Sequence, residues 1–287
     1  MAHAPDPQCE RAADILLGLV HAMEMLTFNP FDAQINPAGL ADWYRFLNLG
    51  QHVPVVGGSD KMAAAMLLGG IRTYAHLGER EFTYDHWKAA VRAGNTFVTV
   101  GPLVELAVEG QPAGATVRLP SSGGTLAVSW KVESVACPVD SVEVVVGGRC
   151  VEEISLAPVR ERREWPVSAS GSTTVKVDRS TWIALRVRGS YRGQPNEIAA
   201  HTSAVQILVE GSRLFAPDDA LSVLEQIEGS LTYLDTLAPR PEVARFKQMR
   251  AALLEAHTAL HRDLHASGIP HHNSPVHAQS HADVSAG

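Results

Sequence analysis

A short apolar run that ends in two glycines and an aspartate is the strongest chemical signal in this sequence. Residues 53–56 are valines apart from Pro54, and Gly57-Gly58-Ser59-Asp60 follows them. β-Branched residues favour a buried parallel strand, and glycines let the backbone turn sharply. Asp60 should therefore lie just past the carboxyl end of a strand, which is the rim where α/β folds place chemistry. The motif predicts a metal-binding or catalytic Asp60, with an ordinary loop before a helix N-cap as the alternative.

A cation follows on the next predicted strand. Residues 69–77 read as this strand, and Arg72 and Tyr74 are two residues apart, so they share one of its faces. A guanidinium close to Asp60 can orient a carbonyl or phosphate group of a substrate. It can equally neutralise Asp60 or a helix C-terminus. Arg72 is therefore predicted to bind substrate or to pair with a carboxylate.

Alternating helices and strands are expected to position these residues. Helical patterns cover residues 9–20, 38–48 and 83–94, and strand-like runs cover 22–28, 53–56, 69–77 and 96–100. This alternation is typical of βα units around a parallel sheet. The first 102 residues are therefore expected to form part of a βα barrel.

The hydrophobic period changes after residue 102. Apolar residues alternate with polar ones in short runs between 103 and 212, and turn residues such as Gly147-Gly148 separate these runs. Short alternating strands at this spacing predict an antiparallel β-sandwich. Trp130 is in phase with Val128 and Val132, which favours a place in the core over one at the surface.

Two helices should follow over residues 213–266, each with a proline at its start, and pack as a helical hairpin. The second helix carries His257, His261 and His265 at four-residue steps, a spacing that can chelate a metal. These histidines lie in or beside the apolar stripe, so packing or surface roles are favoured. Residues 267–287 are rich in histidine and poor in apolar residues, which predicts a disordered tail.

Several segments together resemble one enzyme family. WYRFLNLGQHVPVVGGSD, GIRTYAHL, HWKAAVRAGNTFVTVGPLVELAVEGQPAG, WIALRVRGSYRG and EIAAHTSAVQILVEG are similar to the CehA/McbA family of metallohydrolases, in the PHP superfamily. The resemblance runs from about residue 10 to about residue 265. It implies a PHP-type βα barrel with metal ions at its C-terminal rim, followed by a β-sandwich. It also implies that Asp60 matches the late carboxylate ligand of a divalent ion, which would be zinc, manganese or iron.

The early part of the family pattern is missing. PHP enzymes take ligands from a His-x-His or His-x-Asp pair near the start of the barrel, and no such pair precedes Asp60. A catalytic zinc needs three protein ligands and an open position. The chain is therefore expected to be the C-terminal part of a metal-dependent hydrolase of the amide/ester or phosphoester class, inactive alone. Its expected partner is a chain or segment that carries the missing barrel half. A noncatalytic interaction module and a gene fragment are the alternatives.

Composition excludes several classes of protein function. The 287 residues include 45% hydrophobic and 19% charged ones with a formal charge of −7, which argues against nucleic-acid binding. No run approaches the roughly 18 apolar residues of a membrane span, and no signal-peptide pattern is present, so the cytoplasm is the default compartment. Three cysteines favour reduced thiols, although Cys137 and Cys150 could pair across two strands.

Overall fold

The structure is a computed structural model that describes residues 10–25, 35–61, 64, 67–135, 137–156, 167–191, 194–240 and 242–269. It contains two compact units. The described residues of the first unit lie between 21 and 214, and those of the second are 10–20 and 215–269.

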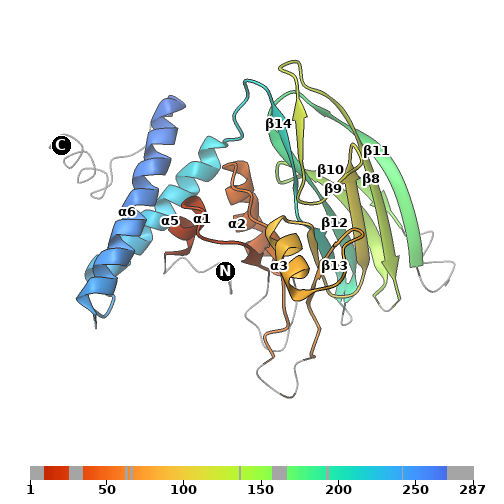
Figure 1. Ribbon diagram of the computed structural model, residues 1–287, viewed down its shortest axis with the longest axis horizontal. Coiled ribbons are helices and arrows are strands. Elements are labelled where there is room, and N and C mark those ends of the chain that lie inside the picture. Colours follow the sequence, from red (N-terminus) through yellow and green to blue (C-terminus); the bar gives the residue numbers. More distant parts are fainter. Residues whose placement is uncertain are drawn as a thin grey trace. The chain divides into compact units, whose positions relative to one another are not determined.

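A β-sandwich makes up most of the first unit (Figure 1). One sheet has eight strands and runs in the order β10-β9-β12-β13-β4-β3, with β14 beside β12 and β7 beside β14. The other sheet has the order β11-β8-β5-β6. The strands of the eight-stranded sheet are β3 (Arg72–Ala75), β4 (Thr96–Thr99), β7 (Thr116–Leu119), β9 (Val139–Val146), β10 (Arg149–Ser155), β12 (Thr181–Tyr191), β13 (Gln194–Thr202) and β14 (Val205–Val209). Those of the four-stranded sheet are β5 (Leu103–Val108), β6 (Gln111–Pro112), β8 (Gly124–Ser134) and β11 (Val167–Val177).

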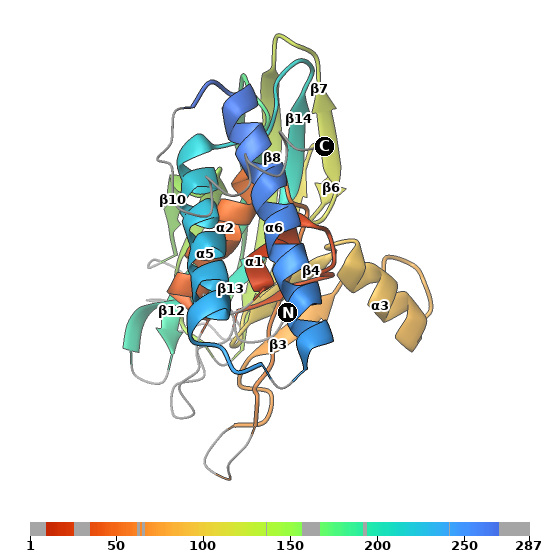
Figure 2. The same ribbon diagram turned by 90° about the vertical axis from the view of Figure 1, so that its left-hand side faces the viewer.

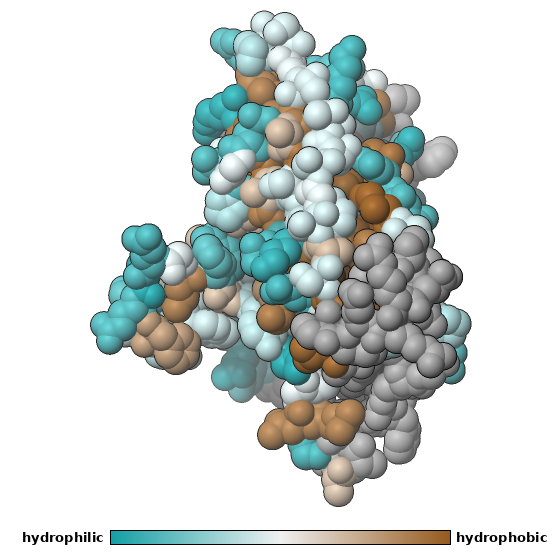
Figure 3. Space-filling model, turned by 90° about the vertical axis from the view of Figure 1, so that its right-hand side faces the viewer, coloured by the Kyte–Doolittle hydropathy of each residue, from teal (hydrophilic) through white to brown (hydrophobic). Residues whose placement is uncertain are grey.

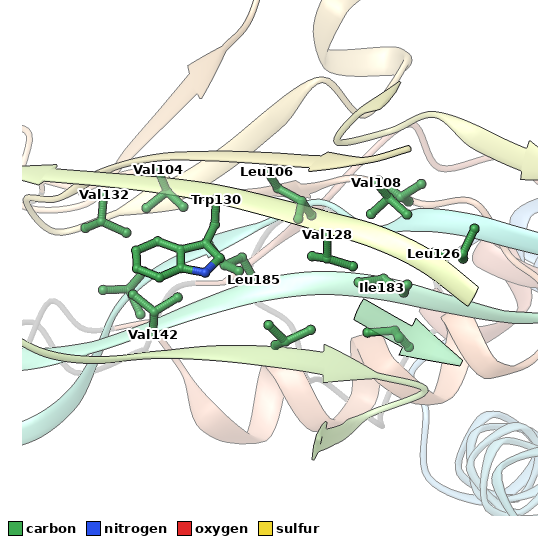
Figure 4. Close-up of a cluster of buried hydrophobic side chains, with 14 of the residues drawn as sticks. Val104, Leu106, Val108, Leu126, Val128, Trp130, Val132, Val142, Ile183 and Leu185 are labelled. Atoms are coloured by element: carbon green, nitrogen blue, oxygen red, sulfur yellow. The ribbon is translucent and has the colours of Figure 1, made fainter. Parts of the chain in front are cut away.

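The core of the sandwich follows from the alternation of apolar residues. Successive side chains of a strand point to opposite faces, so every second residue of β5 and β8 is buried. Trp130 lies among these valines and leucines between the sheets (Figure 4). Its indole takes the space beside Gly171 on β11, where an added Cβ would lie 2.6 Å from Trp130 Cζ2. The predicted antiparallel sandwich and the place of Trp130 are confirmed.

The predicted parallel sheet of the first 102 residues is only partly present. β1 (Met23–Glu24) and β2 (Val55–Val56) do pair in parallel. β3 and β4 instead pair antiparallel, and β4 also pairs antiparallel with β13 of the sandwich. The inward side chain of β4, Phe97, packs against the sandwich core. The expectation that β3 and β4 belong to a parallel βα sheet is therefore wrong, and the expected boundary at residue 102 falls inside one unit.

Two helices of the first unit have clear sequence signals. α2 (Pro37–Asn48) starts with a proline after Asn36, whose side chain accepts a hydrogen bond from Ala38 N. α3 (Tyr84–Arg92) is capped by Thr83, whose Oγ1 accepts a 3.1 Å hydrogen bond from His86 N. α2 buries Trp43 and Tyr44 against Trp182 of β12, whereas α3 buries only Ala90.

The second unit is helical, and the predicted hairpin is confirmed. α5 (Pro217–Thr236) and α6 (Val243–Ala266) lie side by side, and α1 (Arg11–Leu16) contacts both (Figure 2). Leu224, Ile227 and Leu231 of α5 are buried, as are Leu253 and Leu260 of α6. None of the described helices is both long and apolar enough to span a membrane. The tail from residue 270 onwards lies outside the described residues.

Candidate functional site

The glycine corner after β2 is held by hydrogen bonds to the next strand. Thr73 Oγ1 accepts a 2.8 Å hydrogen bond from Gly57 N and donates a 2.7 Å bond to Gly57 O. This reciprocal pair fixes the backbone at the carboxyl end of β2. Asp60 follows three residues later with φ +41°, a left-handed conformation that aspartate tolerates better than most residues. The predicted Asp60 is therefore a partly buried residue at the end of a parallel strand.

Gly57 is required by close packing, which gives a test of the corner. A Cβ at this position would overlap Val98 and lie 2.7 Å from Ile71 Cγ2. Gly57→Ala should lower the free energy of unfolding by about 2 kcal/mol, because neighbouring side chains must move. Gly58→Ala is the matched control, since its nearest atom would be Glu24 Oε1 at 3.6 Å. Chemical denaturation of both variants checks this; equal effects would contradict the packing argument.

A second carboxylate lies at this corner and was not selected from the sequence. β1 and β2 pair in register at Glu24 and Val56, so both strands end at the same edge. Glu24 Oε1 consequently lies close to Gly58, two residues before Asp60. The parallel pairing of β1 and β2 explains this position of Glu24, because it brings the carboxyl ends of the two strands together.

Arg72 lies at the start of β3, next to Thr73 of the corner. Its Nε is buried and has no hydrogen-bond partner among the described residues. Most buried polar groups are paired, so an unpaired guanidinium nitrogen is an unusual feature. The position suits either predicted role, since a phosphate, a carboxylate or a substrate carbonyl can accept from this nitrogen.

The metal ligands of a complete site are not all present here. Among the described residues, no three His, Cys, Asp or Glu side chains are placed to hold one metal ion. Two carboxylates at the corner fall short of the three protein ligands that a catalytic zinc takes. The described residues therefore do not fit a complete zinc, manganese or iron centre, and no catalytic step through a metal follows from them.

Comparisons with known proteins add no assignment. No family model matches the chain. No curated protein is significantly similar to it either.

The three histidines of α6 lie on one side of the helix and contact one another. His257 is fully buried, and its Nε2 lies 3.0 Å from Glu228 Oε1 of α5. Its ring stacks on His261 at 5.8 Å, and His261 meets His265 edge-on at 4.4 Å. They belong to no three-ligand set in the described part of the chain. His257 and His261 are buried and His265 is exposed, in line with the favoured packing or surface roles.

A buried polar network on the outer face of the eight-stranded sheet also went unnoticed in the sequence. Tyr44 Oη of α2 lies 2.6 Å from Nε2 of the fully buried His201. Burial raises the pKa of Tyr44 to about 12 and lowers the pKa of His201 to about 3. Nearby, Glu143 accepts hydrogen bonds from the Nε atoms of Arg186 and Arg188. The hydrogen bond between Tyr44 and His201 joins α2 to the sheet.

The two cysteines in the described part of the chain, Cys137 and Cys150, are free thiols. Cys137 is buried and Cys150 is exposed, so the alternative of a disulfide between them is wrong. Burial raises the pKa of the Cys137 thiol to about 11, which makes it a poor nucleophile at neutral pH. Cys9 lies outside the described residues.

Proposed function

We propose that this chain is the C-terminal part of a PHP-type, metal-dependent hydrolase and supplies Asp60 to its metal site and Arg72 to its substrate site. The reaction class is amide/ester or phosphoester hydrolysis. The remaining ligands come from a chain or segment that carries the other barrel half. Without it, the proposal predicts no hydrolase activity.

One observation carries this proposal. Glu24 is the last residue of β1 and Asp60 follows β2, and these two parallel strands end at the same edge. Arg72, whose Nε has no hydrogen-bond partner among the described residues, lies on the strand bonded to that corner. Two carboxylates at one edge, with a cation on the adjoining strand, are suited to a divalent ion and an anionic or polarised substrate group. A divalent ion in a completed site would lower the pKa of a bound water.

Manganese binding tests the assignment of Asp60. Titration of the purified chain with Mn²⁺, followed by electron paramagnetic resonance, should show one weak site. Asp60→Asn should weaken that site by about tenfold or more, because it removes a ligand charge. Asparagine is the suitable replacement, since it also tolerates the positive φ of this position.

Asp85→Asn is the matched control, because Asp85 is a surface carboxylate that pairs with Lys88 on α3. It should leave Mn²⁺ binding unchanged. Equal affinities of the wild type and Asp60→Asn would refute the metal role of Asp60.

A noncatalytic interaction module is the second candidate, and exposed apolar side chains favour it. Leu67, Leu68, Phe82 and Tyr84 are 56%, 83%, 77% and 70% exposed. Apolar groups also form several separate patches on the face shown in Figure 3. Large exposed apolar side chains close in sequence are typical of surfaces that a partner covers. Two results together would favour this candidate. The Asp60→Asn variant would bind a partner as tightly as the wild type does, and the complex of the wild type with that partner would hydrolyse no amide, ester or phosphoester.

A further inference from the structure

Part of one edge strand of the sandwich, β5, is unpaired on one side among the described residues and lies beside a cavity. A cavity of about 530 Å³ lies between β3–β4 of one sheet and β5 of the other. Its aromatic wall is formed by Tyr74 and Phe97, whose rings stack at 5.1 Å and 6°. Tyr74 is 40% exposed, so this stack is open to solvent. Val104 and Leu106 of β5 line the opposite side.

The backbone of β5 carries free hydrogen-bonding groups along this cavity. β6 pairs with β5 only at Ala107 and Val108, so the edge from Leu103 to Leu106 has no neighbouring strand in the described part of the chain. Glu109 and Gly110 both have positive φ, as in a two-residue hairpin turn. In such a turn the flanking residues, Val108 and Gln111, form the pair joined by backbone hydrogen bonds. The backbone N–H and C=O groups of successive residues in a strand point toward opposite neighbours. Those of Val104 and Leu106 therefore point away from β8, as those of Val108 do. The 2.9 Å bond from Glu109 N to Ala127 O of β8 agrees with this alternation.

The charge at this edge indicates what can pair with it. Glu105 lies between Val104 and Leu106, its side chain is exposed, and it makes no ion pair with any described residue. Lys131, which faces it on β8, is paired with Glu133 at 3.2 Å. A strand added at this edge would place one residue opposite Glu105, where a cation is favourable and an anion is not.

A second copy of the chain is a poor occupant of this edge. Antiparallel pairing of two β5 strands with Val104 opposite Leu106 would set Glu105 directly against its own copy. Like charges at that position destabilise a pair of strands. Pairing centred on Val104 would instead place Leu106 opposite Pro102, which has no N–H to donate.

We propose that β5 accepts an extended peptide of a partner as an additional antiparallel strand, with the sequence pattern apolar–basic–apolar. The two apolar residues pair with the backbone of Val104 and Leu106 and direct their side chains toward Tyr74 and Phe97. The basic residue lies opposite Glu105 on the outer face. Backbone pairing supplies affinity and the alternate side chains supply specificity, as in other strand-addition sites. This inference is independent of the hydrolase proposal, since the cavity does not include Asp60.

Fluorescence anisotropy with a labelled, blocked pentapeptide tests the site. The probe Thr-Phe-Lys-Val-Thr should bind the full chain one-to-one and saturably below about 1 mM. N-methylation of its phenylalanine and valine should weaken binding about tenfold or more, because both N–H donors to β5 are lost. Tyr74→Ala should also weaken binding severalfold, through loss of the aromatic wall.

Charge reversal distinguishes this edge from nonspecific attraction to an acidic protein. Wild type should prefer Thr-Phe-Lys-Val-Thr over Thr-Phe-Glu-Val-Thr by about twofold to fivefold, and Glu105→Lys should invert the preference. Glu152→Lys, which reverses an exposed charge on β10, is the matched control and should leave the preference unchanged. Absence of saturable binding, equal binding of the N-methylated probe, or a dimer of the chain that the probe disperses would each overturn the proposal.

Discussion

Glu143→Gln is expected to lower the free energy of unfolding by about 2–3 kcal/mol. Glu143 is 7% exposed and is the shared acceptor of Arg186 and Arg188. Removing one partner from a buried ion pair typically costs about 3–5 kcal/mol, because the remaining charges stay buried without compensation. The arginine side chains are 16% and 24% exposed, so water reaches them in part and the effect falls below that range.

Glu153→Gln provides a close control for this prediction. Glu153 faces Glu143 directly on β10 but is exposed. Its replacement should change the free energy of unfolding by no more than about 0.5 kcal/mol. Urea denaturation at neutral pH measures both variants. Similar small losses would mean that the arginines find other acceptors once Glu143 is neutral.

Sequence periodicity was sufficient for the sandwich and for the helical hairpin. Strict alternation in β5 and β8 allows only one face to be buried, so Trp130 and its valine neighbours could be placed without coordinates. The proline at the start of α5 and the spacing of its leucines likewise leave little freedom. In these segments, local pattern and tertiary packing demand the same conformation.

The pattern was insufficient for the strands that flank α3. A strand, a helix and a second strand indicate a βα unit, yet β3 and β4 pair antiparallel. Whether two strands pair parallel or antiparallel depends on the path of the chain between them. The order of helices and strands in the sequence does not specify that path. The decisive contact is long-range, between β4 and β13, about 100 residues apart in sequence. Period analysis cannot see such a contact.

The candidate site shows the same division. Asp60 was predicted because glycines beside an apolar run are a local signal. Glu24 was missed because its place beside Gly58 depends on the register of β1 against β2. The network around His201 was missed for a related reason, since Tyr44 and His201 are 157 positions apart. A site formed by residues far apart in sequence can be recognised only once the fold shows which segments lie together.

Acid should unfold the first unit through His201. The ring is fully buried, Nδ1 donates to Thr202 O at 2.8 Å, and Nε2 accepts from Tyr44 Oη at 2.6 Å. Both nitrogens are therefore used by the neutral form. Burial lowers the pKa of His201 from 6.5 to about 3, and the charges of Arg186 and Arg188 act in the same direction.

The sign of the pH dependence follows from proton linkage. Between pH 6.5 and about 3, the unfolded chain binds a proton at this position and the folded chain does not. Stability is therefore greatest above pH 6.5 and decreases as the pH falls through this window. One such group contributes a slope of about 1.4 kcal/mol per pH unit.

Comparison with His201→Gln isolates this contribution from the other titrating groups. The glutamine amide can still accept from Tyr44 Oη but takes up no proton in this range. Urea denaturation at intervals from pH 7 to pH 4 should show the variant less stable at pH 7, because the shape of the site is altered. The wild type should then lose stability faster than the variant by about 1.4 kcal/mol per pH unit below pH 6. Parallel curves for the two proteins would show that His201 is protonated in the folded chain, and that the bond from Tyr44 does not require a neutral ring.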